Sequence, residues 1–353
     1  MAELVGSQSL PSLPPILAGR MTPEVKERVE QFYFSVAAIF ETWVKRRQSK
    51  HTQRAYREDI MAFVNFAGIR WPEESARLLT VSIKDVQAFR DAIAKRDGAP
   101  KTINRRISSL SSFYKYLAGA AAELRLPITV PNPAHAQFIS RESADARDET
   151  RALSVIRARQ LMSLPSGESV LEYRDRAILK LFIYSGIRLG TGCRLKVEDF
   201  HLEDGNATIR LHEKGDKRRT IGLNPVAGQA IEEYIQHAGL TSGPLFRPRR
   251  APGSAMLAGR AMGEVTLYRV ILSYLERLPG AMKEVSGKGG EPEKRCIYTP
   301  HSLRATTATL LLDGNNDMAE VQDLLGHRHI TTTQIYDKRR RGTSHSASHK
   351  LVI

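Results

Sequence analysis

Residues 324–336 have the sequence LLGHRHITTTQIY, which places a histidine, His327, nine positions before a tyrosine, Tyr336. The apolar residues that precede Gly326 predict a helix that this glycine ends, because glycine readily adopts the left-handed conformation found at helix C-termini. We expect a threonine of the pair 331–332 to cap the short helix that follows. The pattern therefore predicts that His327 emerges from a turn just before a helix that carries Tyr336.

A second segment, YTPHSLR at residues 298–304, contains a histidine and an arginine three positions apart. Thr299 or Pro300 is suited to opening a helix, which places His301 and Arg304 on one helical face. A lone His-x-x-Arg pair is common by chance, so its meaning depends on the segments that accompany it.

Two further basic residues follow a helix end and occupy a turn. The apolar stripe of residues 174–185 predicts a helix that ends before Gly-Ile-Arg at 186–188. Residues 207–211 and 220–223 predict two strands, and Lys214 lies between them beside a Gly-Asp pair that suits a hairpin turn. Taken singly, each of these cations is expected to be an ordinary surface residue.

Together, these segments resemble the tyrosine recombinase (phage integrase) family in order, identity and spacing. The matching residues are Gly186-Ile187-Arg188, Glu213-Lys214-Gly215, His301-Ser302-Leu303-Arg304, and Leu325-Gly326-His327 followed by Tyr336. The resemblance covers roughly residues 30–340, and in the first half it rests on Thr52, Tyr56, Asp59, Phe63 and Lys101-Thr102-Ile103-Asn104. One departure is Thr191, which stands where the family usually has an acidic residue three positions after the first arginine.

The resemblance implies a mainly α fold with a small β-sheet, in which a helical, SAM-like core-binding domain precedes an α+β catalytic domain. It also implies a DNA strand transferase, a site-specific recombinase that works through a 3′-phosphotyrosyl intermediate. Tyr336 is the implied nucleophile, and it needs assistance because a phenol has a pKa of about 10. His301 is placed to accept its proton, and Lys214 to protonate the leaving 5′ oxygen.

Arg188 and Arg304 are the implied phosphate ligands, since a guanidinium donates in a planar fork and stays charged. His327 is expected to donate to a non-bridging phosphate oxygen. Because bond energy is kept in the covalent link and the cations are side chains, we expect neither a cofactor nor a metal ion.

Composition points independently to a polyanionic partner. The chain has 353 residues, of which 53 are basic and 38 acidic, giving a formal charge of +15. Its 41% hydrophobic content is enough for cores in two domains. We find neither a signal-peptide layout nor a run of about 18 apolar residues. Cys193 and Cys296 make no disulfide framework or zinc site, so a cytoplasmic, nucleoid-associated protein is expected.

Periodicity and breaker residues divide the chain. Apolar spacing predicts four helices in the first half, around residues 32–43, 56–64, 81–93 and 103–117. We expect a flexible tail over residues 1–25, the core-binding domain over 26–120, an extended linker over 121–150, the catalytic domain over 151–340 and a tail over 341–353. The Gly- and Glu-rich stretch 286–293 predicts a mobile loop.

Basic residues interleave with the helical stripes of the first half and flank the predicted hairpin, where they are positioned to follow a phosphate backbone. The candidate DNA-binding residues are Lys45, Arg46, Arg47, Lys50, Arg54, Lys101, Arg105, Arg106, Lys217, Arg218 and Arg219.

The family resemblance implies double-stranded DNA with an inverted-repeat site as the partner. Two protomers would bind each site and four would form the synapse. The protein would be a monomer in solution, and accessory DNA-bending proteins would assist the assembly. We expect the apolar end, Leu351-Val352-Ile353, to dock on a neighbouring protomer. The reaction would integrate, excise or resolve a mobile element or replicon.

Three alternatives stay open at this stage. A type IB topoisomerase shares the chemistry but relaxes DNA, and a preference for an inverted repeat distinguishes the two. A non-catalytic DNA-binding protein of the same fold is disfavoured by the complete set of catalytic residue types. A metal-dependent nuclease is disfavoured by the lack of an obvious carboxylate cluster, and activity in EDTA would exclude it.

Overall fold

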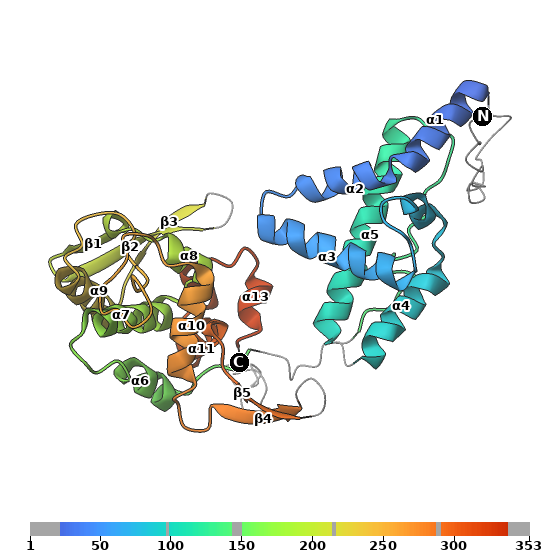
Figure 1. The fold of residues 1–353 in the computed structure, drawn as a ribbon. Coiled ribbons are helices and arrows are strands. Elements are labelled where there is room, and N and C mark those ends of the chain that lie inside the picture. The colour runs from blue at the N-terminus through green and yellow to red at the C-terminus, as the bar shows by residue number, and fades with distance from the viewer. Residues whose placement is uncertain (1–21, 97–98, 143–149, 214–216, 287–290, 338–353) are drawn as a thin grey trace, which may run out of the picture. The chain divides into compact units, whose positions relative to one another are not determined.

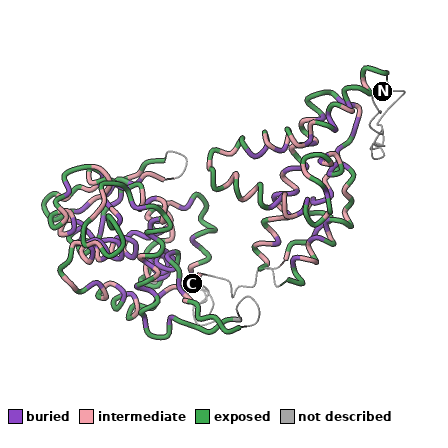
Figure 2. The backbone as a smooth tube through the Cα atoms, viewed as in Figure 1, coloured by how far each residue is buried: buried purple, intermediate pink, exposed green. Residues whose placement is uncertain are grey.

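The computed structural model describes residues 22–96, 99–142, 150–213, 217–286 and 291–337. The chain divides into two compact units, Met1–Asp148 and Glu149–Ile353, called here the N-terminal and C-terminal units. Each has its own hydrophobic core, and Figure 2 shows buried residues gathered inside each. None of the helices in these described ranges is long and apolar enough to cross a membrane.

The N-terminal unit is helical in its described part (Figure 1). Its elements are α1 (Pro23–Phe34), α2 (Val36–Lys45), α3 (Lys50–Phe66), the 3₁₀ helix η1 (Ser75–Thr80), α4 (Ile83–Lys95) and α5 (Pro100–Glu123). The helix expected over 32–43 is divided at Ser35, whose hydroxyl donates to Phe32 O. Helix α1 begins within the expected tail, because Thr22 caps it and Pro23 occupies its first turn.

The predicted linker is in part a packed segment. Leu126, Ile128 and Val130 alternate along an extended stretch and are all buried against the N-terminal core. Alternate residues of an extended chain face one side, so these three apolar side chains hold an extended segment on the helices. Ile139 is buried in the same core. The extended linker expected from residue 121 is therefore corrected, and residues 143–149 lie outside the described part.

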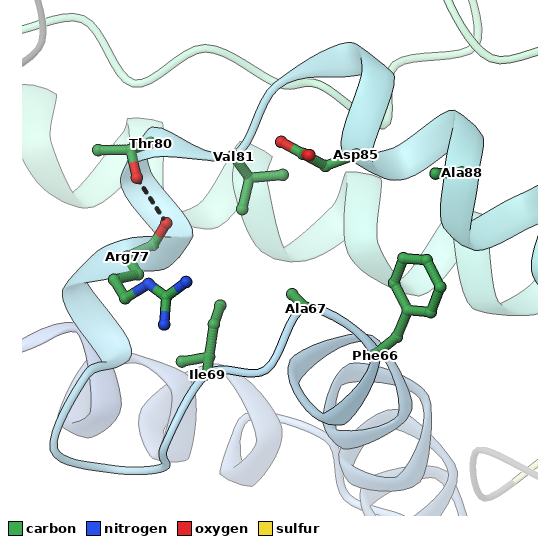
Figure 3. Close-up of a pocket in the computed structure, with 8 residues that line it drawn as sticks. All are labelled: Phe66, Ala67, Ile69, Arg77, Thr80, Val81, Asp85 and Ala88. Atoms are coloured by element: carbon green, nitrogen blue, oxygen red, sulfur yellow. Dashed lines mark hydrogen bonds between the residues drawn. The ribbon is translucent and has the colours of Figure 1, made fainter.

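A surface pocket of about 360 Å³ lies between the end of α3, η1 and the start of α4 (Figure 3). Phe66, Ile69 and Val81 give it an apolar wall, and Arg77 and Asp85 add charged groups. None of the residues that line it belongs to the predicted catalytic set.

The C-terminal unit combines helices with two small antiparallel sheets (Figure 1). Its helices are α6 (Val155–Ser163), α7 (Val170–Ser185), α8 (Leu189–Arg194), η3 (Val197–Asp199), α9 (Pro225–His237), α10 (Glu264–Leu275), α11 (Pro300–Asp313), α12 (Met318–Leu325) and α13 (Ile330–Gln334). Its strands are β1 (Phe200–Glu203), β2 (Asn206–His212), β3 (Arg218–Gly222), β4 (Met282–Ser286) and β5 (Pro292–Cys296).

The first sheet has the order β1-β2-β3 and contains the two predicted strands. Ile209 pairs with Ile221 across β2 and β3, and both are buried against the core. Strand β1 was not predicted, because its four residues are too few to show an alternating pattern clearly.

The second sheet shortens the loop expected over 286–293, because Ser286 ends β4 and Pro292 begins β5. Strands β4 and β5 form an antiparallel hairpin in which Lys283 pairs with Arg295 and Glu284 with Lys294. Both strands are exposed and carry charged residues. Their sequence therefore lacks the apolar alternation by which a half-buried strand is predicted. Residues 287–290 of the expected loop lie outside the described part.

Helix α7 lies at the centre of this unit and packs against α9 and α11. Ala177, Ile178, Leu181 and Phe182, the predicted apolar stripe, are all buried. Since α11 also packs against α12, and α12 against α13, three of the four motif segments found in the sequence lie on helices that pack against one another.

Candidate active site

The turn after α7 is fixed by Gly186. This residue ends α7 with φ +59°, a left-handed conformation that favours glycine. A Cβ atom here would lie 2.5 Å from Cδ2 of Leu325, so the close approach also requires glycine. The turn places Arg188 at the N-cap of α8, with its side chain 46% exposed.

Helix α11 begins as the sequence predicts. Thr299 is its N-cap residue, Pro300 occupies the first turn, and the backbone N–H of Thr299 donates to Oγ of Ser302 at 3.0 Å. His301 lies at the exposed edge of the site, whereas Arg304 is only 3% exposed. The two are on successive turns of one helix face, but their environments differ.

The guanidinium of Arg304 joins three segments of the unit. Its Nη1 donates to Gly186 O at 2.6 Å, and its Nη2 donates to Leu325 O at 2.7 Å. Both acceptors are carbonyls at helix ends, where backbone oxygens have no partner within the helix. Arg304 therefore ties α11 to the ends of α7 and α12.

Helix α12 ends at Gly326, which has φ +65°. His327 follows with 8% exposure, and its Nδ1 lies 2.8 Å from Oγ1 of Thr333. The N-cap of α13 is His329, not the expected Thr331 or Thr332, and it makes no side-chain capping bond. Within this run of threonines, the side chain of Thr333 makes a hydrogen bond, and its partner is His327 rather than the backbone at the start of α13.

Tyr336 lies two positions beyond the last residue of α13, rather than within the helix as expected. Its backbone N–H donates to Thr333 O at 3.0 Å. Its ring packs against a small cluster that includes Leu312, Val321 and Leu325. The ring is also nearly parallel to that of His327, so the predicted proximity of the imidazole and the phenol is present.

A buried carboxylate links two arginines at the root of the β2–β3 hairpin. Oε1 of Glu213 lies 3.3 Å from Arg188 Nη1 and 3.3 Å from Arg219 Nη2, and the glutamate side chain is 9% exposed. Arg219 also donates to Asp323 O at 2.7 Å. Arg188 Nη2 lies 3.4 Å from Gly326 O. This network holds Arg188 beside the loop that carries His327.

The site is strongly electropositive. Burial and, as the next cause, the charge of Arg188 lower the pKa of Arg304 to about 10. Burial also lowers the pKa of His327 to about 4, with Arg304 and Arg188 as the next causes. The pKa of His301 is lowered by the same three effects in the same order. Both histidines are consequently neutral at pH 7, which suits one to accept a proton and the other to donate a single hydrogen bond.

Five of the six predicted catalytic residues are thus brought to one place, namely Arg188, His301, Arg304, His327 and Tyr336. The sixth, Lys214, lies outside the described residues. Of the described residues on either side of it, Glu213 donates from its backbone N–H to Lys217 O at 2.8 Å. Two guanidiniums, two neutral imidazoles and a phenol can bind a phosphodiester and attack it.

Two predicted DNA contacts are bound to a buried carboxylate. Asp59 is 1% exposed and lies 2.6 Å from Arg105 Nη1 and 3.9 Å from Arg106 Nε. Burial raises the pKa of Asp59, although Ser109 and the two arginines favour its charged form. These arginines therefore stabilise the packing of α3 against α5, while Arg105 stays 47% exposed.

The other candidates in the N-terminal unit lie at its surface, except that Arg47 is half-buried with its guanidinium 5.1 Å from the ring centre of Tyr56. The exposed ones are Lys45, Arg46, Lys50, Arg54 and Lys101. In the hairpin, Lys217 and Arg218 are exposed. Arg219 instead turns inward to Glu213.

Two residues of the site were not among the sequence-predicted set. Glu213 precedes Lys214, and only the folded hairpin shows that its carboxylate faces Arg188 and Arg219. Thr333 lies six positions after His327, within a run of three threonines that sequence alone does not distinguish. Within the described ranges, no three His, Cys, Asp or Glu side chains gather in a group able to hold a metal ion.

Comparison with known proteins gives two family matches. Residues 152–341 match the phage integrase family, and residues 40–120 match the phage integrase N-terminal SAM-like domain. Among curated proteins, the chain is 30% identical to tyrosine recombinase XerC of Syntrophus aciditrophicus over 83% of this chain and 88% of that protein. It is also 30% identical to tyrosine recombinase XerD of Listeria innocua, over 83% and 89% respectively.

Solved structures share the fold. A XerH site-specific recombinase bound to palindromic difH substrate matches with a TM-score of 0.65 at 17% identity, covering 96% of this chain and 99% of that one. A lambda integrase dimer bound to a COC′ core site matches with a TM-score of 0.61 at 16% identity, covering 92% and 83%. The predicted architecture, a helical domain followed by an α+β domain, is confirmed.

Proposed function

The chain belongs to the phage integrase family of tyrosine recombinases, and from this membership we propose that it exchanges DNA strands at a defined site. It is a DNA strand-transferring enzyme, and its function is site-specific recombination. The similarity to recombinases over most of the chain favours this function over DNA relaxation. The observation that carries the proposal is the meeting of Arg304 of α11 with Arg188, His327 and Tyr336, which follow the ends of α7, α12 and α13.

In the proposed reaction, Arg188 and Arg304 bind the non-bridging oxygens of one phosphodiester. Tyr336 Oη attacks the phosphorus, so that an O–P bond forms to tyrosine and the bond from phosphorus to the 5′ oxygen breaks. His301 accepts the phenolic proton, and Lys214 gives a proton to the departing 5′ oxygen. The products are a 3′-phosphotyrosyl link and a 5′ hydroxyl.

The second half of the proposed reaction reverses the first with another strand. A 5′ hydroxyl attacks the phosphotyrosine, a new phosphodiester forms and Tyr336 regains its proton. The energy of the broken bond is kept in the tyrosyl ester, so the strand exchange needs no nucleotide hydrolysis. Positive charge that is already fixed around the phosphate stabilises the added negative charge of both transition states.

We assign the two units to two tasks. The N-terminal unit is proposed as the core-binding domain and the C-terminal unit as the catalytic domain, with the division near residue 149. Double-stranded DNA is the partner, as the net charge of +15 favours. We further propose an inverted-repeat site, a tetrameric synapse, accessory DNA-bending proteins and a place in the nucleoid. Docking by residues 351–353, which lie outside the described part, and integration, excision or resolution of a mobile element or replicon belong to the same proposal.

Covalent capture tests the proposed function and finds the site in one experiment. Protein is mixed with fragments of the genome that carries its gene, in EDTA, and the reaction is stopped with SDS. We expect DNA linked to protein, enriched for one sequence, and no link with Tyr336→Phe. A link that persists in this variant would identify another nucleophile. Reaction that EDTA abolishes would refute a mechanism built on side-chain cations.

A further inference from the structure

The hydroxyl of Thr333 touches the ring of His327. Oγ1 of Thr333 lies 2.8 Å from Nδ1 of His327, and the two residues are 0% and 8% exposed. The neighbouring threonines of the same run, at 331 and 332, are exposed. The contact therefore belongs to one threonine of the three and is shielded from water.

The number of protons in this contact is limited. At pH 7 His327 is neutral, because burial and the nearby arginines lower its pKa to about 4. A neutral imidazole carries one N–H, at either Nδ1 or Nε2. The threonine hydroxyl carries one proton as well, and Nδ1 is the acceptor that the described residues offer it.

The two ring tautomers differ in what happens to the hydroxyl proton. With the ring proton on Nε2, Thr333 donates to Nδ1 and the buried hydroxyl proton is satisfied. With the ring proton on Nδ1, the hydroxyl must accept, and its own proton is left in a buried place without that partner. An unsatisfied buried donor is costly enough to favour the other tautomer about five-fold or more.

We propose that Thr333 is a positioning residue that holds His327 as the Nε2–H tautomer and so directs its one N–H donor away from α13, toward the phosphate. This inference rests on the proposed function, because it specifies how His327 serves as a donor there. Thr333 does not touch the reacting atoms in this scheme. It acts by deciding which ring nitrogen carries the proton.

The variants separate the hydroxyl from the packing of its methyl group. Thr333→Val keeps the shape and removes the hydrogen bond, whereas Thr333→Ser keeps the hydroxyl and removes the methyl group. Thr309→Val is a matched control, since Thr309 on α11 is also buried and its Oγ1 has no hydrogen-bond partner among the described residues. A role in packing alone predicts that Thr333→Ser is the more harmful change at position 333.

The first measurement uses the full-length protein without DNA. ¹⁵N-histidine labelling and long-range ¹⁵N–¹H spectra at pH 7 report the tautomer of each histidine, and His327→Asn assigns the signal of interest. We expect Nε2–H in the wild type, in Thr333→Ser and in Thr309→Val, and a tautomer mixture in Thr333→Val. An Nδ1–H signal in the wild type, or an unchanged signal in Thr333→Val, would overturn the proposal.

The second measurement follows tyrosyl-DNA formation on the captured site. Complete loss of a transition-state donor costs on the order of 10²–10³ in rate, so partial loss in Thr333→Val should slow cleavage by about 10-fold, with DNA affinity unchanged. Thr333→Ser should restore the rate to within about three-fold. Equal rates in Thr333→Val and wild type would overturn the proposal when His327→Asn is slow. If His327→Asn also cleaves at the normal rate, the proposed function of His327 has failed instead.

Discussion

The rings of His327 and Tyr336 lie almost parallel, with 13° between their planes and 6.3 Å between their centroids. A turn at Gly326 and the short helix α13 fold the intervening residues so that the two side chains face one region. Tyr336 is held by packing against the ends of α11 and α12, through residues such as Leu312 and Leu325. A substitution of Tyr336 can therefore remove the hydroxyl while the ring keeps this packing.

Tyr336→Phe should remove chemistry and leave the fold intact. The phenylalanine ring retains the packing of the tyrosine ring, so the melting temperature is expected to stay within about 2 °C of the wild type, as for a change worth a few tenths of a kcal/mol. Tyrosyl-DNA formation should fall to background, while binding of the captured site persists. Gel-shift and SDS-capture assays on the same samples give both readouts, and loss of binding together with cleavage would contradict the assignment.

Substitution of Arg304 should lower the stability of the protein more than substitution of Arg188, whereas both substitutions should slow cleavage. Arg304→Lys leaves at least one of the carbonyls of Gly186 and Leu325 without its partner, at a cost of about 1–3 kcal/mol. Arg188→Lys changes a side chain that is 46% exposed and should hardly shift the melting temperature. Both should slow tyrosyl-DNA formation by on the order of 10²–10³. A stable Arg304→Lys variant with normal cleavage would refute the structural role given to this guanidinium.

Gly326→Ala should disturb the network around Glu213 as well as the backbone. A Cβ atom at 326 would lie 2.9 Å from Glu213 Oε2 and 3.0 Å from Arg219 Nε. The matched control is Gly239→Ala, because Gly239 has a similar φ of +58° with nothing within 4 Å. Gly239→Ala should lower the free energy of unfolding by the backbone strain alone, roughly 1–2 kcal/mol. Gly326→Ala should cost more and should also slow cleavage, as measured by thermal unfolding and SDS capture, whereas equal costs would show that the network adapts.

The lowered pKa of His327 predicts a loss of stability in acid. The pKa in the folded state is about 4 and the ordinary value is 6.5, so the unfolded chain binds this proton first as the pH falls. Stability is therefore fully present above about pH 6.5 and is lost between about pH 6.5 and 4, by at most about 3 kcal/mol. His327→Asn should unfold with a shallower pH dependence over this range. His329→Asn, at an exposed neighbour, should retain the wild-type slope.

The basic residues of the N-terminal unit should fall into two groups, those that contact DNA phosphates and those that stabilise the fold. Lys50→Ala changes an exposed residue and, if it contacts a phosphate, should reduce the slope of log affinity against log salt by about 0.9 with no change in melting temperature. Arg105→Ala removes the 2.6 Å partner of the buried Asp59 and should lower the melting temperature. Fluorescence anisotropy over a salt series and thermal unfolding distinguish the groups. An affinity that does not vary with salt would count against DNA contact by this unit.

Helix boundaries and helix ends were largely predictable from local sequence. Thr299 and Gly326 act through bonds and dihedral angles within a few residues of themselves, so their positions in α11 and α12 follow from short-range rules. The same holds for the two strands of the Gly-Asp hairpin. Local rules were less successful at Ser35, where a helix breaks without proline or glycine, and at β4 and β5, whose charged residues lack an apolar pattern.

By itself the sequence determined the order of the motifs, the nine-residue interval from His327 to Tyr336 and the family to which these residues belong. The folded structure was needed to show that Arg304 is buried between two helix ends, that Glu213 faces two arginines, and that Thr333 rather than its neighbours bonds His327. The difference lies in the sequence separation between the residues that interact. Caps and turns depend on nearby residues, whereas hydrogen-bond partners and burial at this site join residues up to 138 positions apart.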